Sequence, residues 1–335
     1  MTSHIDSIID KTPQNSYKKI KAIILEKLPA EFYNDSKIKE YYQRGAPSSK
    51  LNGLVNLGFN CYLNSVVQCL AYAPGFRQFV NDLPNILYSL HSNETFFLDY
   101  LCHTFNEMKF NKSPSSDWIL QDLGYIYPAY ALPEQQDAHE FLLRFLEYLH
   151  SECSVGLISS GHSFISRYFS GESSQIMTCS ICGTKEHKLT QFYDITIPIL
   201  EFNTASQAIS NFTSTLQVTF DCPKCGTKTT ATKEEHINRL PYILIITMMR
   251  FINESKKIEK FLPYEKEIDF NGGHYSLYSM IIHEGHLIYH GHYISYVKDS
   301  EGRWYKVDDI VVSSSNENDV LSQSPYILFY QRILD

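Results

Sequence analysis

The sequence has no apolar run long enough to span a bilayer, which takes about 20 residues. Its longest apolar stretch is YILIITMM, at 242–249. The N-terminal residues MTSHIDSIID are polar and acidic, unlike a secretory signal. We therefore expect no membrane association and a cytosolic or nuclear location, where disulfides are rare. The eight cysteines are then free thiols, metal ligands or nucleophiles, and the sequons at Asn93 and Asn211 are chance matches.

Repeats, low-complexity tracts and an excess of basic residues are absent as well. With 15 glycines and 13 prolines in 335 residues, the composition is not that of a collagen-like or disordered chain. The formal net charge of −8 argues against direct binding of nucleic acid and is compatible with a basic protein partner. Hydrophobic residues make up 43% of the chain, enough to bury the core of one large domain or two ordinary ones.

Residues 1–50 are predicted to be an N-terminal extension of unknown role. The segment SYKKIKAIILEKLPAEF predicts a short helix broken at Pro29, and the following GAPSSK is typical of a linker. Three roles stay open for this extension: binding a protein partner, packing on the rest of the chain, or remaining mobile.

Hydrophobic periodicity changes along the chain. The segments CYLNSVVQCLAYAP and PEQQDAHEFLLRFLEYLH have apolar residues at helical spacing; Pro74 ends the first and Pro133 opens the second. From about residue 215 onward strands are predicted, in PYILIITMMRF, YSLYSMIIHE, HYISYV, RWYKVDD and PYILFYQRI. A mostly helical first half and a mostly β last third predict an α+β fold.

Four cysteines form two C-x-x-C pairs, each followed by glycine: Cys179 with Cys182, and Cys222 with Cys225. Two such pairs in a chain without disulfides indicate a tetrahedral four-thiolate site for Zn²⁺. The 39 residues between the pairs exceed the spacing of a compact zinc ribbon. We expect a closed, structural site; the alternative is two unrelated turns with free thiols.

Cys61 differs from the remaining cysteines because it lies in the first turn of a predicted helix that begins at Tyr62. A thiol there experiences the positive end of the helix dipole, which favours the nucleophilic thiolate. Gly58 allows a sharp turn just before it. On this context alone, a buried small residue is the commoner interpretation. The other unpaired cysteines are expected to be packing residues: Cys69, Cys102 and Cys153.

Four histidines lie within ten residues in HEGHLIYHGHYISY: His283, His286, His290 and His292. A nucleophilic cysteine needs a base, and the base needs an orienting group. A hairpin centred on Ser300 would place His292 directly opposite Asp308, with Asp309 on the other face of the strand. Ordinary acids flanking a turn are the alternative. A metallohydrolase built on the histidine cluster would leave Cys61 and Asp308 unexplained.

Together these segments resemble the ubiquitin-specific protease family. GLVNLGFNCYLNSVVQCL is similar to the family's Cys box, GLxNLGNTCYxNSxxQxL, and QQDAHEFLLRFLEYL to its QQDAxEFLxxLLDxL segment. RYFSGESSQIMTCSICG resembles the beginning of its zinc-bearing region. YSLYSMIIHEGHLIYHGHYISYVK with RWYKVDDIVV resembles its His box, and PYILFYQR its closing strand. The matches run in order from about residue 51 to 332.

The resemblance implies a papain-like cysteine protease fold with a helical thumb, zinc-bearing β fingers and a β-rich palm. The catalytic domain would cover 51–335, with the thumb at about 51–155, the fingers at about 160–240 and the palm at about 241–332. The implied reaction is thiol-dependent hydrolysis of the isopeptide or peptide bond after the C-terminal glycine of ubiquitin. Ubiquitin and ubiquitinated proteins are the implied partners.

Position by position, the resemblance makes Cys61 the nucleophile, His292 the general base and Asp308 the residue that orients this base. Asn56 matches the family's oxyanion-hole side chain, and Asp309 matches a second acid that supports the site in some members. An oxyanion donor of this kind is worth roughly 10²–10³ in rate.

Further matches concern the substrate. Gln135, Asp137 and Glu140 match positions that contact the basic C-terminal tail of ubiquitin, and Tyr293 matches the aromatic residue that lines the channel for this tail. Acids at the start of a helix also complement its dipole, and both roles are compatible. His283 matches the first His-box position and is expected to support the site. The other two histidines of the cluster are expected to face solvent or substrate.

The Cys box departs from the family pattern directly before the nucleophile, where Phe59-Asn60 replaces the usual Asn-Thr. Asn60 would add a polar contact near the thiolate or slightly re-aim the loop. Because the other motif residues are present, we expect activity. Two alternatives remain: a ubiquitin-binding module with weak or no catalysis, and a protease for another ubiquitin-like modifier.

Overall fold

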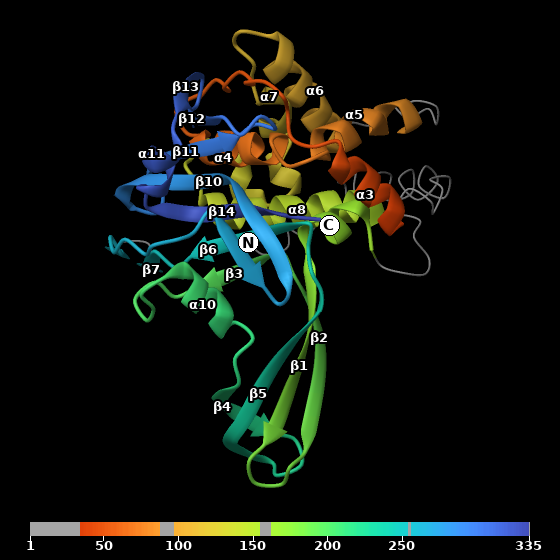
Figure 1. Ribbon diagram of the computed structural model, residues 1–335, viewed down its shortest axis with the longest axis vertical. Coiled ribbons are helices and arrows are strands. Elements are labelled where there is room, and N and C mark those ends of the chain that lie inside the picture. Colours follow the sequence, from red (N-terminus) through yellow and green to blue (C-terminus); the bar gives the residue numbers. More distant parts are fainter. Residues whose placement is uncertain (1–33, 88–96, 155–161, 254–255, 335) are drawn as a thin grey trace, which may run out of the picture.

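The computed structural model describes residues 34–87, 97–154, 162–253 and 256–334. The short helix predicted to end at Pro29 lies outside these residues. Figure 1 shows a helical layer, a large sheet packed against it and a narrow sheet that projects away from both. Within the described ranges, no helix combines the length and apolar character needed to cross a membrane.

The helical layer confirms the two helices predicted from periodicity and adds others. Its helices are α3 (Asp35–Gln43), α4 (Cys61–Ala71), α5 (Phe76–Leu87), α6 (Phe97–Phe110), α7 (Asp117–Leu120), α8 (Ala138–Ser154) and α9 (Phe164–Phe169), with 3-10 turns η3 (Leu123–Tyr125) and η4 (Pro128–Ala131). Helix α8 starts later than the Pro133 opening predicted. Asp137 caps it, because its Oδ1 accepts the backbone N–H groups of His139 (2.6 Å) and Glu140 (2.9 Å).

The large sheet is antiparallel apart from one parallel pair, β3 with β6. In spatial order its strands are β13 (Val311–Ser315), β12 (Trp304–Asp308), β11 (His290–Lys298), β10 (Gly273–Leu287), β14 (Pro325–Arg332), β6 (Ile243–Met248) and β3 (Asp194–Ile197), with β9 (Glu267–Phe270) also paired to β10. A small separate pair joins β7 (Phe251–Asn253) and β8 (Lys256–Lys257).

Both faces of the large sheet are buried. Along β14, Ile327 and Phe329 belong to the core under the helices, whereas Leu328 and Tyr330 belong to a second core on the opposite face. Side chains alternate between faces along a strand, so a strand covered on both sides is apolar at every position. The second core is closed by α10 (Ala205–Asn211) and α11 (Glu317–Leu321).

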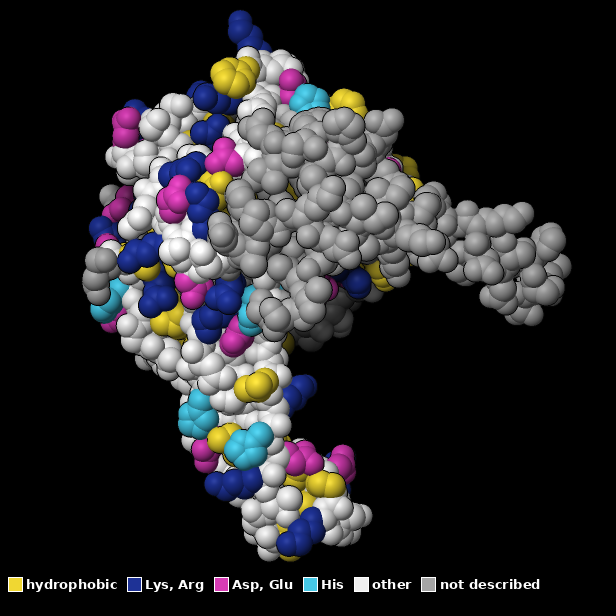
Figure 2. Space-filling view, turned by 90° about the vertical axis from the view of Figure 1, so that its right-hand side faces the viewer, with side chains coloured by type: hydrophobic (Ala, Val, Ile, Leu, Met, Phe, Trp, Pro, Cys, Tyr) yellow, Lys and Arg dark blue, Asp and Glu magenta, His cyan; other side chains and the backbone are white. Residues whose placement is uncertain are grey.

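The projecting sheet has the strand order β2 (Lys185–Phe192), β1 (Gly171–Cys179), β5 (Thr227–Arg239) and β4 (Leu216–Cys222). Strands dominate from about residue 215 onward, as periodicity predicted, but they already begin at Gly171, within the fingers at about 160–240 that the resemblance implied. Strand β2, KEHKLTQF, is largely exposed on both faces, so it lacks the apolar alternation that reveals a strand. Figure 2 shows mainly polar, histidine and charged side chains along this projection.

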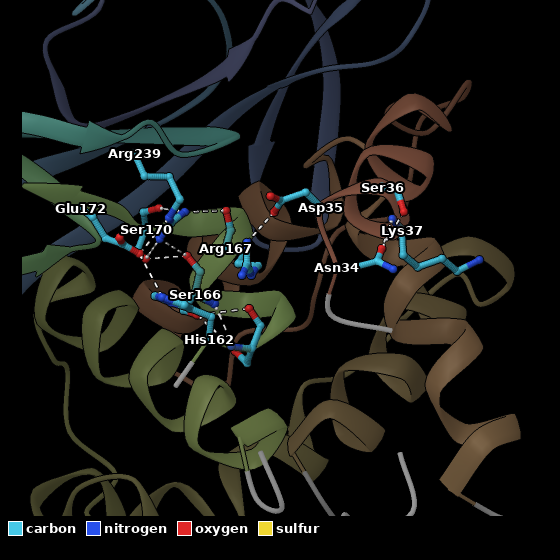
Figure 3. Close-up of polar contacts among 11 residues, drawn as sticks. Asn34, Asp35, Ser36, Lys37, His162, Ser166, Arg167, Ser170, Glu172 and Arg239 are labelled. Atoms are coloured by element: carbon cyan, nitrogen blue, oxygen red, sulfur yellow. Dashed lines mark hydrogen bonds and ion pairs between the residues drawn. The ribbon is translucent and has the colours of Figure 1, made fainter. Parts of the chain in front are cut away.

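A network of polar contacts joins the base of the projecting sheet to the helical layer (Figure 3). At the end of β5, Arg239 Nε donates to Glu172 Oε1 (2.9 Å) and its Nη1 donates to the backbone oxygens of Ser170 (2.8 Å) and Arg167 (3.2 Å). Arg167 in turn forms an ion pair with Asp35 at the start of α3 (2.6 Å). Fixed donors at this junction therefore tie the projection to α9 and α3.

The described part of the N-terminal extension packs on the rest of the chain. Helix α3 buries Ile38, Tyr41 and Tyr42 in the core under the helical layer. The segment after it is no free linker, since the Pro47 oxygen accepts the Ser300 N–H (3.0 Å). Of the three roles considered, packing applies to residues 34–50. A protein partner for the preceding residues stays a prediction and lies outside the described residues.

Candidate active site

Cys61 is the first residue of α4, one position earlier than predicted, and only 1% of it is exposed. Gly58 has φ +101° with open space where a Cβ would lie, so backbone conformation is what requires glycine there. The helix then packs its apolar face on β11 and β10. The Cys61 N–H is among the first amides of the helix, which have no intrahelical acceptor. The thiol and this amide therefore occupy the same end of α4.

His292 on β11 and Asp308 at the end of β12 are in contact, with 2.6 Å between Nε2 and Oδ1. Their predicted register is wrong: the hairpin is centred on Glu301, not Ser300, so the two residues are not directly opposite. The turn lies at 299–303 where the sequence predicted 298–302, and moving its centre by one residue shifts the pairing of the two strands by two positions. A shift of two positions leaves both side chains on the same face, as diagonal neighbours, and the contact survives.

The Cys61 side chain also reaches His292. Because Nε2 is bonded to Asp308, Nδ1 is the ring nitrogen available to the thiol. The hydrogen bond of His292 with Cys61, together with the one that Asp308 accepts, raises the pKa of His292 to about 9 against the opposing effect of burial. The imidazolium form is thus stabilised at neutral pH by one neighbour on each side of the ring.

Asp309 does not point to the other face of the strand, as the hairpin predicted. It follows the last residue of β12 with φ +50°, which turns its carboxylate back toward the site. Its Oδ2 accepts a hydrogen bond from Asn56 Nδ2 (2.7 Å) and lies 3.8 Å from His292 Nε2. Its Oδ1 accepts one from Asn64 Nδ2 (2.9 Å). Asp309 therefore joins the histidine to two asparagines of the Cys box.

The Asn56 carboxamide is fixed on both sides. Its Oδ1 accepts the backbone N–H groups of Gly58 (2.8 Å) and Asn60 (3.3 Å), while its Nδ2 faces Asp309. This pattern sets the orientation of the amide, because a flip would place Oδ1 against a carboxylate. One N–H of Nδ2 is left over for a further acceptor.

Sequence reasoning missed Asn64 and did not foresee how Asn60 is used. Both are buried, at 2% and 0% exposure, at the start of a helix whose other buried residues are mostly apolar. Asn60 Nδ2 lies 3.2 Å from Asn64 Oδ1. The detectable signal was two amides four residues apart on a buried helix face, which must find hydrogen-bond partners.

The histidine-rich segment forms the β10–β11 hairpin, not a loop. Leu287 pairs with His290 across a two-residue turn, and the side chain of His286 is 91% exposed. His283 is buried against Tyr293, with 4.7 Å between ring centroids. Within the described residues neither of its ring nitrogens has a hydrogen-bond partner. Burial lowers its pKa to about 4, so it is a neutral packing group beside the site.

The four residues matched to substrate contacts lie in different environments. Gln135 Oε1 accepts the N–H of Gly291, directly before His292 (3.0 Å). Asp137 is buried as the cap of α8 and also accepts the Tyr326 hydroxyl (2.7 Å). Glu140 pairs with Arg144 (2.7 Å), and Tyr293 is only 3% exposed. Asp137 and Glu140 both line one surface depression. Their contacts with a substrate stay predictions.

The two C-x-x-C pairs meet at the tip of the projecting sheet. Strands β1 and β4 run in the same direction on either side of β5, so their carboxyl ends, which carry the two pairs, converge. All four sulfur atoms lie within 4.8 Å of one another. Sγ–Sγ separations of 3.9 Å (Cys179–Cys225) and 3.6 Å (Cys182–Cys222) match the edge of about 3.8 Å of a tetrahedron with metal–sulfur bonds of about 2.3 Å.

The electrostatics of this cluster also fit a cation. Hydrogen bonding to Thr184 lowers the pKa of Cys182 to about 6, which favours a thiolate. The neighbouring Cys182 sulfur raises the pKa of Cys225 to about 12. A second thiolate therefore forms readily only when a positive charge lies between them. The four cysteines can hold a metal ion.

Comparison with known proteins agrees with this arrangement. The model of the ubiquitin carboxyl-terminal hydrolase family matches residues 52–330. The chain is 28% identical over 303 residues to ubiquitin carboxyl-terminal hydrolase 23 of Arabidopsis thaliana, covering 84% of this chain and 35% of that protein. It is 28% identical over 309 residues to ubiquitin carboxyl-terminal hydrolase 17-like protein D of Mus musculus, covering 84% and 55%. The chain thus spans about a third to a half of these relatives.

Two solved structures share the fold. One is the SAGA Ubp8/Sgf11/Sus1/Sgf73 DUB module bound to ubiquitin aldehyde, with TM-score 0.72, 23% identity, and 92% of this chain and 77% of that chain covered. The other is the same module bound to monoubiquitin, with TM-score 0.71, 24% identity, and coverage of 92% and 76%. The helical layer, projecting sheet and large sheet thus form the predicted α+β fold of thumb, fingers and palm. The chain belongs to the ubiquitin carboxyl-terminal hydrolase family.

Proposed function

We propose that this chain is a cysteine-type deubiquitinase, which hydrolyses the isopeptide or peptide bond after the C-terminal glycine of ubiquitin. The observation that carries the proposal is the contact of His292 with Cys61 on one side and with Asp308, at 2.6 Å, on the other. A thiol at a helix N-terminus, a base and an orienting carboxylate are the parts that thiol-dependent acyl transfer needs.

In the proposed reaction, His292 accepts the proton of Cys61 through Nδ1, and the thiolate attacks the glycine carbonyl carbon. The raised pKa of His292 keeps the resulting imidazolium protonated near neutral pH. That proton then passes to the leaving amine as the carbon–nitrogen bond breaks, which leaves a thioester on Cys61. His292 next takes a proton from water as the water oxygen attacks the thioester carbon. The carbon–sulfur bond then breaks, which releases the C-terminal carboxyl group of ubiquitin and leaves the Cys61 thiolate beside the His292 imidazolium.

The tetrahedral intermediate carries a negative oxygen that needs donors. The free N–H of Asn56 Nδ2 and the backbone N–H of Cys61 are the donors that we assign to it. Asp309 has a supporting role here, since its carboxylate holds Asn56 by the other N–H. Donors fixed before the reaction stabilise the developing charge without a reorganisation cost.

The four-cysteine cluster is proposed to bind a structural Zn²⁺. Cys179, Cys182, Cys222 and Cys225 would fill all four positions of a tetrahedral ion, leaving none for substrate. The ion would hold the tips of two hairpins together in a sheet that has only a small apolar cluster of its own. Its contribution is to the folding of the projection, not to the chemistry.

Ubiquitin and ubiquitinated proteins are the proposed partners, in the cytosol or the nucleus. Glu140 and Asp137 supply negative charge to the depression beside β6, which suits a basic peptide tail. Gln135 would position the tail indirectly, through its hydrogen bond to Gly291 in front of the base.

A panel of fluorogenic substrates tests the proposal. Ubiquitin and other ubiquitin-like modifiers, each with a C-terminal amide fluorophore, would be assayed with wild type and Cys61→Ala. We expect hydrolysis of the ubiquitin substrate by wild type alone, and covalent labelling of wild type by an electrophilic ubiquitin C-terminal probe. Binding of ubiquitin without hydrolysis would identify a binding module instead. Faster hydrolysis of another modifier would identify that modifier, not ubiquitin, as the substrate. Labelling that persists in Cys61→Ala would show that Cys61 is not the nucleophile.

A further inference from the structure

Asn60, the residue directly before the nucleophile, has a fully buried side chain whose oxygen and nitrogen both form hydrogen bonds. Its Oδ1 accepts the backbone N–H of Leu57 at 2.7 Å. Its Nδ2 lies 3.3 Å from the Val55 oxygen, 3.2 Å from Asn64 Oδ1 and 3.2 Å from Ser116 Oγ. One carboxamide thus connects the turn in front of Cys61, the helix behind it and the segment that precedes α7.

This use of Asn60 is unlike that of an ordinary helix cap. Asparagine at the N-cap position normally accepts a hydrogen bond from the second or third amide of the helix. Asn60 occupies that position before α4, yet its side chain makes no capping bond and turns back toward Leu57. The first amides of α4 therefore keep their donors, including the Cys61 N–H assigned to the oxyanion.

The two asparagines around the turn together occupy three of its backbone amides. Asn56 Oδ1 accepts the N–H groups of Gly58 and Asn60, and Asn60 Oδ1 accepts that of Leu57. Such a turn has few alternative conformations, because a change would break hydrogen bonds between its amides and buried or half-buried acceptors. The position of Asn56 Nδ2 relative to the Cys61 N–H is then set by Asn60 as much as by Asp309.

We propose that Asn60 is a positioning residue for the oxyanion donors: its carboxamide holds the Leu57–Gly58 turn so that Asn56 and the first amide of α4 face the same point. The proposal rests on the deubiquitinase function above and concerns a residue where this chain departs from the family pattern. Threonine, usual there, has a single hydroxyl on Cβ. A hydroxyl cannot accept from Leu57 and donate toward Asn64 and Ser116 on the opposite side at once.

The test separates oxyanion chemistry from the integrity of the thiol. Asn60→Ala and Asn60→Thr would be compared with wild type and with Asn316→Thr, a matched change at the N-cap of α11, whose side chain does cap its helix. Three assays would be run: kcat and KM for a fluorogenic ubiquitin amide, the inhibition constant of ubiquitin aldehyde, and the rate at which iodoacetamide alkylates Cys61. Aldehyde capture forms an oxyanion, whereas alkylation forms none.

We expect Asn60→Ala to lower kcat by about tenfold, below the roughly 10²–10³ lost when a donor is removed outright. KM should change less than twofold, ubiquitin aldehyde should bind about tenfold more weakly, and alkylation should keep its wild-type rate. Asn60→Thr should lose less than Asn60→Ala, and Asn316→Thr should match wild type in all three.

Unchanged kcat and aldehyde binding in Asn60→Ala would overturn the inference, as would a parallel fall in alkylation, which indicates collapse of the whole site. An inactive wild type that is still alkylated at Cys61 would refute the proposed function instead. If Asn60→Ala does not fold, Ser116→Ala removes one partner of the Asn60 amide. Ser116→Ala should lower kcat about twofold to fivefold and weaken the binding of ubiquitin aldehyde, while the alkylation rate stays at the wild-type value. An equal fall in the alkylation rate would again oppose the inference.

Discussion

Replacement of Asp308 by asparagine should move the alkaline limit of activity to lower pH. Asp308 Oδ1 lies 2.6 Å from His292 Nε2, and its negative charge helps to raise the pKa of His292 to about 9. In the proposed reaction the imidazolium protonates the leaving amine. Activity should therefore fall as the pH rises through about 9 in wild type, when this proton is lost.

The size of the shift follows from charge and exposure. Unit charges about 4 Å apart interact by about 1 kcal/mol in water and about 4 kcal/mol at an effective dielectric constant of 20. The side chains of His292 and Asp308 are 33% and 42% exposed, so the aqueous limit is the nearer one and about 1–2 kcal/mol is appropriate. One pKa unit corresponds to about 1.36 kcal/mol. We expect the alkaline limb to move from about pH 9 to about pH 8.

The assay is kcat/KM for a ubiquitin isopeptide substrate between about pH 6 and pH 10.5. Asp308→Asn should also lower the rate itself, since a wrongly oriented base can cost up to about 10⁴ in kcat. Asp269→Asn is a matched control, because Asp269 pairs with His274 away from the site and the change in net charge is the same. An alkaline limb that coincides in Asp308→Asn and wild type would refute the electrostatic role of Asp308 and leave it an orienting role only.

The raised pKa of His292 also determines how the stability of the folded state depends on pH. A histidine whose folded pKa exceeds its ordinary value of 6.5 stabilises the folded state fully below that value. This contribution is lost as the pH rises from about 6.5 through about 9. Urea unfolding at several pH values should show the loss in wild type and a smaller one in Asp308→Asn.

Three further changes test other parts of the structure. Gly58→Ala should lower kcat and destabilise the fold by about 1–3 kcal/mol through backbone strain, whereas Gly302→Ala, also at positive φ with open space, should leave kcat unchanged. Cys182→Ser should reduce bound zinc below one equivalent and make the projecting sheet sensitive to proteolysis, with Cys102→Ser, outside the cluster, as control; equal zinc in both variants would refute the site. Ile38→Ala, in a fully buried position of α3, should lower the free energy of unfolding by about 2–5 kcal/mol, against less than about 0.5 kcal/mol for the 70% exposed Ile181→Ala.

Local sequence patterns were sufficient where one element alone decides the outcome. Helical spacing predicted α4 to within one residue of Cys61, and continuous apolar runs predicted β6 and β14. The α+β class followed from the order of these elements. Strand β2 was not predicted from periodicity, because its side chains are exposed on both faces and its sequence therefore has no apolar alternation.

The hairpin prediction shows how far pairing can be read from sequence. The turn between β11 and β12 was assigned the wrong centre, since strand pairing depends on the turn conformation that the packed sheet selects. An error of two positions preserves the face of every side chain, so the His292–Asp308 contact was still predicted. Asp309 was placed wrongly for a different reason: it lies past the end of the strand, where φ +50° ends the alternation.

The sequence by itself determined which residues this protein has for its chemistry: a thiol at the start of a helix, a histidine and an acid on neighbouring strands, and two C-x-x-C pairs. Periodicity and residue type are local properties, and they suffice for that inventory. Only the tertiary structure decided how these groups meet. The four cysteines converge because β1 and β4 run in the same direction beside β5. Asn60 makes no capping bond to the first amides of α4 because Leu57, Asn64 and Ser116 surround its side chain in the folded chain, and a buried amide must satisfy both its oxygen and its nitrogen.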